Sequence, residues 1–411
     1  MPGTVFYQPF VSTSVYVDSA LNSLQGVKKN NLAPDSYLLT GTTGSAISPP
    51  GYGALYIGAI DGSSTSSGSG SGTWYNFSVP STWNPQETSV YGPDILTSGD
   101  GPGGIGDVDL AGTWIDASGV LLGFYYRGSL SALNGDASGA VKEGFQRFQA
   151  KTRINSPADF TYLHSVDGGY VVGNYTTSGG PLALAINSGP GSGSFVFDPR
   201  TSSQVDIQYS DESRYHSAFG IWANDDATYT ISGGASSSPN LLITPPLFGQ
   251  VTSRFDATVK SEPGWGKALD RIYEALPDAV LGSGMLADLD PITGVASNVR
   301  HYSYLNRCDV ITHFQGIDYL GGGVYQAPFV AVELNGQVHT GNAYMKRLDD
   351  GQFAKDAVWQ TFGSDPFGAG ALISTSVAEN VNTGVYSTLA PFASIGATQP
   401  YFAAAQNLFI I

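Results

Sequence analysis

Three of the five histidines in this 411-residue sequence lie in short segments that resemble one another. His164 and His216 are each followed by serine and a small apolar residue, and His313 lies between Thr312 and Phe314. Because imidazole changes its charge near neutral pH, such histidines suit general acid or base catalysis. They are also common ligands of divalent metals.

Other side chains suited to proton transfer lie on the same segments as these histidines. They carry a phenol, a carboxyl or an amide group and are Tyr91, Asp94, Asp167, Tyr215 and Gln315. Two functional hypotheses follow: the histidines exchange protons with a substrate beside these groups, or two or three of the histidines bind a divalent metal. A third interpretation is structural, in which each histidine hydrogen-bonds the backbone of a neighbouring unit, as Thr and Ser would at equivalent positions.

The histidine segments belong to a pattern that occurs six times. Each occurrence has Thr or His, then Ser or His, then an apolar residue, and the occurrences start at Thr13, Thr88, His164, His216, Thr312 and Thr375. A second segment of β-branched and aromatic residues follows each one and usually contains a glycine, as in Leu39-Thr40-Gly41 and Val172-Gly173-Asn174. Self-similarity at this long period favours a four-stranded sheet as the repeating unit and predicts a β-propeller.

We therefore predict an all-β fold, a single β-propeller of four-stranded antiparallel blades over residues 1–411. Six blades are expected, with five as the alternative, and the blades start near the six residues given above. The last unit is short, so its fourth strand is expected to come from 4–10 and to tie the two chain ends together. Four turn sequences are predicted to be hairpins between strands 3 and 4: 61–62, 197–201, 289–293 and 349–351.

One long insertion, 236–284, is predicted between strands 2 and 3 of blade four. Within it Trp265, Leu269, Ile272 and Leu276 have helical spacing, which predicts an amphipathic helix over 265–276. Strand 1 of a meander starts on the same face as the loop between strands 2 and 3, because the chain reverses at each turn. The insertion is thus either a lid over a ligand entrance or a cover for blade edges.

Strand geometry complicates the histidine cluster. Adjacent residues of a strand point to opposite sides. His313 occupies the second position of the pattern, so it should face away from His164 and His216 unless a bulge restores the register.

A glycine-rich acidic loop offers a separate candidate site. Asp100, Asp107 and Asp109 carry the oxygen ligands that calcium prefers, although a solvated acidic turn would have the same composition. The cofactor thus stays open between a divalent metal on the propeller axis, structural calcium and none.

Charge and composition limit the class of partner. The formal net charge of −16 argues against nucleic acid and anionic membranes, which require clustered Lys and Arg. The single cysteine, Cys308, excludes an intrachain disulfide.

The first residues lack the basic and apolar regions of a secretory signal, and the composition is compatible with a secreted or periplasmic protein, so the localisation stays open.

The segments 170–175 and 228–234 resemble uncharacterised bacterial propeller-like repeat proteins, a resemblance that implies no activity. The histidines occur in only some units, which favours an enzyme with one axial pocket acting on a small organic molecule or a saccharide. It would be a hydrolase, lyase or isomerase. The alternative is a lectin-like binding protein, because 23 Tyr and 6 Trp could stack on sugars. The oligomeric state stays open.

Overall fold

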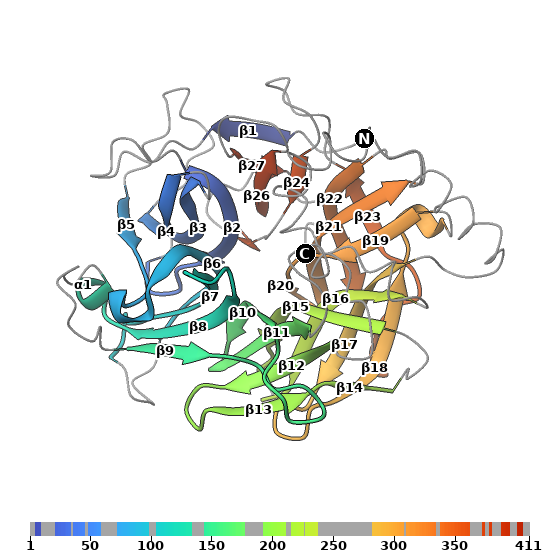
Figure 1. Cartoon of the computed structure of the whole chain (residues 1–411). Coiled ribbons are helices and arrows are strands. Elements are labelled where there is room, and N and C mark those ends of the chain that lie inside the picture. Colours follow the sequence, from blue (N-terminus) through green and yellow to red (C-terminus); the bar gives the residue numbers. More distant parts are fainter. Residues whose placement is uncertain are drawn as a thin grey trace, which may run out of the picture.

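β-Strands form almost all of the regular structure in the computed structural model of this protein (Figure 1). The structure describes residues 5–9, 21–33, 36–45, 48–58, 72–97, 104–133, 144–176, 192–210, 215–225, 227–236, 282–307, 310–333, 338–361, 372–374, 378–379, 388–394 and 401–405.

The described strands form six successive groups, called blades one to six here, and the main strands of a blade pair antiparallel with one another. Single parallel bridges, Gly51↔Glu87 and Phe160↔Leu121, link the first three groups into one sheet. Blade one contains β2 (Leu21–Lys29), β3 (Tyr37–Ser45), β4 (Ser48–Gly58) and β5 (Thr73–Phe77). Blade two contains β6 (Pro85–Ile95), β7 (Val108–Asp116), β8 (Leu121–Gly128) and β9 (Phe145–Phe148). Blade three contains β10 (Phe160–Asp167), β11 (Tyr170–Thr176), β12 (Gly193–Asp198) and β13 (Ser203–Asp206).

The remaining blades have the same plan with small additions. Blade four contains β15 (Tyr215–Ala223), β16 (Tyr229–Ser236), β17 (Ser283–Leu289) and β18 (Val295–Tyr302), and β14 (Gln208–Tyr209) pairs parallel to β18. Blade five contains β19 (Val310–Phe314), β20 (Asp318–Gly321), β21 (Val324–Glu333), β22 (Val338–Lys346) and β23 (Val358–Thr361). Blade six contains β24 (Leu372–Ser374), β25 (Ala378–Glu379), β26 (Thr388–Ser394), β27 (Tyr401–Ala405) and β1 (Val5–Pro9).

The described helices are very short. They are α1 (Leu130–Leu133), η1 (Ser81–Trp83) and η3 (Tyr304–Asn306). None of the helices in the described part of the chain has the length and apolar character that a bilayer crossing requires.

The six groups follow one another around a common centre, so the chain is an all-β propeller (Figure 1). The first strand of each blade lies nearest the centre, and β2, β6, β10 and β15 are neighbours there. β1 pairs antiparallel with β27 from Val5↔Ala405 to Pro9↔Tyr401. This confirms the predicted closure, in which an N-terminal strand completes the last blade.

The hydrophobic core lies between neighbouring blades. Consecutive residues of one strand point to opposite sheet faces, so each inner strand serves two interfaces. In β7, for example, Leu110 joins the cluster between blades one and two, whereas Ala111 joins the cluster between blades two and three. Met285 and Leu286 divide in the same way between the interfaces that precede and follow blade four. Each blade is therefore stabilised by both of its neighbours.

Two of the predicted turn signatures join strands 3 and 4 as expected. The Asp198-Pro199 turn connects β12 to β13, and the Asp290-Pro291 turn connects β17 to β18. Asp290 accepts the backbone N–H of Ile292 at 2.9 Å, as turn-forming aspartates do. The turn at 349–351 likewise lies between β22 and β23, and the predicted turn at 61–62 lies outside the described residues.

A β-bulge interrupts the first strand of each of blades one to four. The bulges lie between Leu24 and Gly26, Val90 and Gly92, Leu163 and Ser165, and Ala218 and Gly220. In blade five the equivalent extra residue lies between Phe314, opposite Phe329, and Asp318, opposite Gln326. Without the bulge, these side chains would point alternately to the two faces of the sheet. The bulge makes them point in a common direction.

The residue after each bulge is small because neighbouring inner strands nearly touch there. A methyl group on Gly26 would lie 1.9 Å from the carbonyl oxygen of Tyr91 in the next blade. A methyl group on Gly92 would lie 2.8 Å from the Cα of Ser165. The strands around the centre therefore approach as closely as their backbones allow.

The glycines of the second strands have a related role. A methyl group on Gly112, Gly173 or Gly233 would lie within 2.2 Å of a first-strand carbonyl oxygen. Beside these glycines, polar side chains hold the next blade: Asn174 donates to the carbonyl of Ala218 at 2.9 Å and accepts its N–H at 3.0 Å. The recurrent glycine of the second segment thus marks the contact with a bulged strand.

The bulges correct the alignment of the repeated signature. Measured from the bulge, Thr88 and His216 correspond to Thr161 of blade three, and not to His164. The threonines at this position have a structural role, since Thr88, Thr161 and Thr312 each accept a backbone N–H from the segment that precedes their strand. Thr13 and Thr375 lie outside the described residues.

The predicted lid also lies outside the described residues, which omit 237–281. The described strands that flank it do fix where it leaves the blade. Ser236 pairs with Tyr215 at the start of β15, at the end of the blade opposite Trp222.

The close approach of the inner strands predicts an asymmetry between two equivalent positions. We expect Gly92→Ala to lower the free energy of unfolding by about 1–3 kcal/mol, because the new methyl group meets backbone atoms of blade three. Ser165→Ala at the same position of blade three should cost less than about 1 kcal/mol, because its Cβ is already accommodated and its hydroxyl makes one long hydrogen bond, 3.4 Å, to Ile221. Urea denaturation of both variants measures this, and equal losses would contradict the steric explanation.

Candidate functional site

Five equivalent residues meet at the centre of the ring. Each lies three positions after the bulged residue of its blade. Four of them lie at or next to the end of the first strand of their blade, and the fifth is the first residue of β20. They are Lys28, Asp94, Asp167, Trp222 and Asp318, and we call them the axial cluster.

Lys28 lies between its neighbours in this cluster. Its Nζ is 3.2 Å from Oδ1 of Asp167, 4.0 Å from Oδ1 of Asp94 and 4.7 Å from the ring centroid of Trp222. The charge of Asp318 also acts on it. Burial by itself lowers the pKa of Lys28, but Asp167, Asp94 and Asp318 together raise it above its ordinary value. Lys28 is therefore a permanent cation.

The three carboxylates share one local conformation. Oδ1 of each accepts the N–H of the next residue: Ile95 at 2.9 Å, Gly168 at 3.0 Å and Tyr319 at 3.0 Å. Asp167 also accepts the N–H of Ala223 from blade four at 2.8 Å. Hydrogen bonds to the backbone thus fix the carboxylates in place without using their remaining lone pairs.

The ionisation of Asp94 is altered by its surroundings. Burial raises its pKa, the charge of Lys28 opposes this, and the charges of Asp167 and Asp109 add to the increase, so that the resulting pKa is about 7. Asp94 therefore carries a proton in a substantial fraction of molecules at neutral pH. The side chains remain 18% (Lys28), 14% (Asp94) and 12% (Asp167) exposed, so the cluster is mostly buried but keeps some contact with solvent.

A layer of aromatic rings lies next to the axial cluster along the inner strands. Tyr91 contacts His164 edge to face at 5.4 Å, His164 stacks on Phe219 at 3.9 Å, and Phe219 meets His313 at 4.5 Å between ring centroids. Three of these four residues, Tyr91, His164 and Phe219, are the bulged residues of their strands. This arc spans blades two to five.

His164 and His313 do approach each other, on either side of Phe219. The bulge that brings them together is at His164 itself, whereas β19 keeps a regular register through His313. His313 bonds Ser217 through Nε2 at 2.8 Å and Gln315 through Nδ1 at 2.6 Å. The predicted register conflict is therefore resolved in blade three, and not in blade five.

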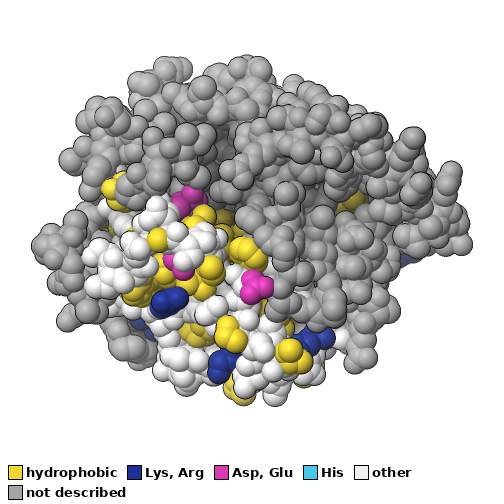
Figure 2. All heavy atoms as spheres, viewed as in Figure 1, with side chains coloured by type: hydrophobic (Ala, Val, Ile, Leu, Met, Phe, Trp, Pro, Cys, Tyr) yellow, Lys and Arg dark blue, Asp and Glu magenta, His cyan; other side chains and the backbone are white. Residues whose placement is uncertain are grey.

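Burial makes both of these histidines poor proton carriers near neutral pH. It lowers the pKa of each to about 3, and for His164 the nearby His313 adds to the effect. On the face shown in Figure 2, hydrophobic and carboxylate side chains are visible among the described residues, and no histidine is. The proton-transfer role of the histidines stays a prediction. The carboxylates of the axial cluster are better placed for proton transfer, because they are less deeply buried.

His216 packs in a different place from the other two. Its ring stacks on Tyr209 at 4.0 Å and lies 6.1 Å from that of His301. Within the described residues, no three His, Cys, Asp or Glu side chains are grouped so as to hold a metal ion. The predicted assembly of three imidazoles around a metal is thus not what the fold brings together. Tyr215 contributes its backbone to β15, but its side chain lies outside the described part.

The aspartates of the acidic loop are engaged separately. Asp109 is fully buried and accepts from Nε of Arg127 at 2.6 Å and also from Nη2. Asp107 accepts the N–H of Gly104 at 2.8 Å, and Asp100 lies outside the described residues. Asp109 also pairs across the sheet with Asp94, so it adds negative charge behind the axial cluster.

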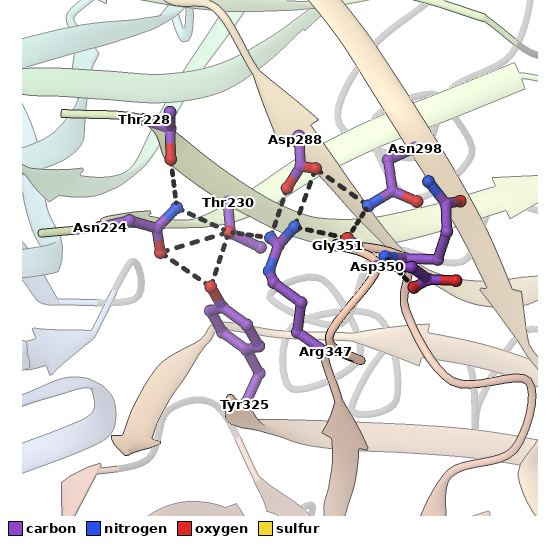
Figure 3. Close-up of polar contacts among 10 residues, drawn as sticks. Asn224, Thr228, Thr230, Asp288, Asn298, Tyr325, Arg347, Asp350 and Gly351 are labelled. Atoms are coloured by element: carbon purple, nitrogen blue, oxygen red, sulfur yellow. Dashed lines mark hydrogen bonds and ion pairs between the residues drawn. The ribbon is translucent and has the colours of Figure 1, made fainter. Parts of the chain in front are cut away.

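A second polar network connects blades four and five (Figure 3). Arg347 donates to Asp288 at 3.0 Å, to Thr230 at 3.1 Å and to the carbonyl of Gly351 at 3.0 Å. Tyr325 donates to Asn224 at 2.8 Å within the same network. Arg347 also lies over the rings of Tyr325 and Phe353. Its donors are used in binding the two blades together, which assigns it a structural role.

Sequence reasoning identified Asp94 and Asp167 but missed the other three members of the cluster. A signal for them exists in the sequence: small residue, apolar residue, then the functional residue. It reads Gly26-Val27-Lys28, Gly92-Pro93-Asp94, Ser165-Val166-Asp167, Gly220-Ile221-Trp222 and Gly316-Ile317-Asp318.

No known family profile and no curated protein matches the sequence. Several solved structures are similar to it at low identity. They include an alpha-L-arabinanase of Penicillium chrysogenum complexed with arabinobiose (11% identity, TM-score 0.46, covering 98% of this chain and 99% of that one). A luciferin-regenerating enzyme is 8% identical (TM-score 0.42, 98% and 96%). A Trypanosoma rangeli sialidase is 8% identical (TM-score 0.45), and the match spans 97% of this chain but 57% of the sialidase. Similarities this low do not indicate what this chain binds or catalyses.

The burial of His164 predicts a specific dependence of stability on pH. The unfolded chain takes up a proton at this residue near its ordinary pKa of 6.5, whereas the folded protein does so only near 3. Stability is therefore lost as the pH falls from about 6.5 toward 3. His164→Phe keeps an aromatic ring against Phe219 but cannot take up a proton. We therefore expect this variant to lose less stability on acidification, by the contribution of roughly one proton. Denaturation curves between pH 3 and 8 measure it, and parallel pH profiles for both proteins would contradict it.

Proposed function

We propose that the axial cluster is the active site of a hydrolase acting on glycosidic bonds, with Asp94 as proton donor and Asp167 as the ionised carboxylate. The observation that supports this most directly is the unequal pair itself. Two carboxyl groups lie beside one ammonium, and burial raises the pKa of one of them, Asp94, to about 7. Glycoside hydrolysis needs this combination, one carboxylic acid and one carboxylate flanking the scissile bond.

The spacing of the pair agrees with this chemistry. Both carboxylates lie within 4.0 Å of Lys28 Nζ, so their nearest oxygens are no more than about 7 Å apart. Pairs of this kind in glycosidases are separated by roughly 5 to 9.5 Å, depending on stereochemical course. In the proposed reaction Asp94 gives its proton to the leaving oxygen as the bond from that oxygen to the sugar carbon breaks. Asp167 either activates a water molecule or attacks the sugar carbon directly.

Trp222 gives the cluster a surface suited to sugars. Its indole is partly exposed, lies beside Lys28 and forms one side of the cluster. Aromatic faces of this kind bind the apolar faces of sugar rings while leaving the hydroxyl groups to polar neighbours. The same surface supports a second candidate, a lectin-like protein that binds a saccharide without cleaving it.

Replacement of the carboxyl groups tests the proposed reaction. With an aryl glycoside found by screening pyranosides and furanosides of both anomeric forms, Asp94→Asn and Asp167→Asn should each lower kcat by at least about 100-fold. Activity of the wild type should fall as the pH rises above about 7, because Asp94 then loses the proton that it donates. The matched control is Asp290→Asn in the exposed β17–β18 turn, which should retain wild-type kcat.

The result also decides between the candidates. Full activity in both axial variants would refute the proposed roles, and a loss in His164→Phe or His216→Ala alone would return the chemistry to the histidines. Saccharide binding by calorimetry with no turnover of any glycoside would favour the lectin.

A further inference from the structure

We propose that Lys28 is a positioning residue that assigns the proton to Asp94 and the negative charge to Asp167. The inference rests on the proposed function for its importance, but not for its test. It follows from where the ammonium lies among the groups that face it.

Lys28 is held at a defined place. β2 reaches the axis because Gly26, two residues earlier, allows its backbone to approach the carbonyl oxygen of Tyr91. From there the side chain extends between β6 and β10 and across the indole of Trp222 in β15. Contacts with three blades restrict the lysine more than a single surface ion pair would.

The contacts of the two carboxylates with Lys28 are unequal. The ammonium is 3.2 Å from Asp167 and 4.0 Å from Asp94, so it stabilises a charge on Asp167 more strongly. Asp167 also accepts two backbone N–H groups, from Gly168 and Ala223, whereas Asp94 accepts one, from Ile95. Both differences favour ionised Asp167 and protonated Asp94.

The remaining charges around the site act in the same direction. Asp318 of blade five adds a negative charge that Lys28 must also balance. Asp109 lies behind Asp94 and is itself paired with Arg127. One ammonium thus faces three axial carboxylates, and a proton on Asp94 reduces the excess negative charge.

Carbon-13 NMR of the aspartate carboxyl groups tests this inference in the intact protein. Asp94 is assigned from the signal lost in Asp94→Asn, and its titration is followed in the wild type, Lys28→Met and Lys28→Arg. We expect a wild-type midpoint near 7 and a rise of roughly 1 pH unit or more in Lys28→Met, because the nearest cation is lost. Lys28→Arg should keep the midpoint near that of the wild type. Lys29→Met, which removes the neighbouring positive charge of β2, is the matched control and should leave it unchanged.

An unchanged Asp94 midpoint in folded Lys28→Met would overturn the proposal, and circular dichroism establishes folding. If Lys28→Met does not fold, a titration of the wild-type protein alone tests the proposal. The Cε signal of Lys28 should then shift with the same midpoint as Asp94, and a Cε signal that is flat through this range overturns the proposal. Because these titrations need no substrate, they can succeed when the protein cleaves no glycoside, so failure of the proposed function is recognised separately.

Discussion

The structure depends on how closely the innermost strands approach one another around the axis. At the residue after each bulge, the backbone of one blade lies almost against that of the next, and a side-chain carbon on Gly26 or Gly92 has no space. The approach is possible because the bulge inserts one extra residue, which interrupts the regular alternation and bends the strand. Where blade three carries Ser165 instead of glycine, its hydroxyl accepts the N–H of Ile221 in blade four. Small residues at one layer therefore set the width of the centre.

That width explains why chemistry and packing separate into two layers. At the bulge itself the side chains are large, and Tyr91, His164 and Phe219 fill the space as a continuous aromatic arc. Three residues further on, the strands end, water enters, and Lys28 and the carboxylates replace the rings. Histidines in the first layer are kept neutral by burial, whereas in the second layer burial raises the pKa of Asp94 and the charge of Lys28 opposes this increase. The depth along a strand, and not the residue type alone, decides which groups can exchange protons with a solute.

The sequence allowed the fold class, the closing strand and the turns after β12 and β17 to be predicted, since each depends on local patterns of apolar, turn and repeat residues. The alignment of the repeats was wrong in blades one and three. In blade one the position three residues before the bulge is Asn22, and not Thr13. A bulge adds one residue to a strand, and no sequence pattern reveals it. The sequence therefore suggested that His164 is equivalent to His216, whereas the structure shows that Thr161 is the equivalent residue. Lys28, Trp222 and Asp318 were missed because their side chains differ chemically while their backbone positions are equivalent. Only the preceding small and apolar residues reveal that equivalence.

The pairing of β1 with β27 affects how the ring is assembled. Val5 meets Ala405, so the last blade joins residues from the two extremes of the chain. Contacts between residues so distant in sequence are entropically costly and form late in folding. During synthesis β1 has no partner in this pairing until β27 has been made, while the blades between them can already stack on one another. Closure of the ring thus waits for the docking of β1 against β27.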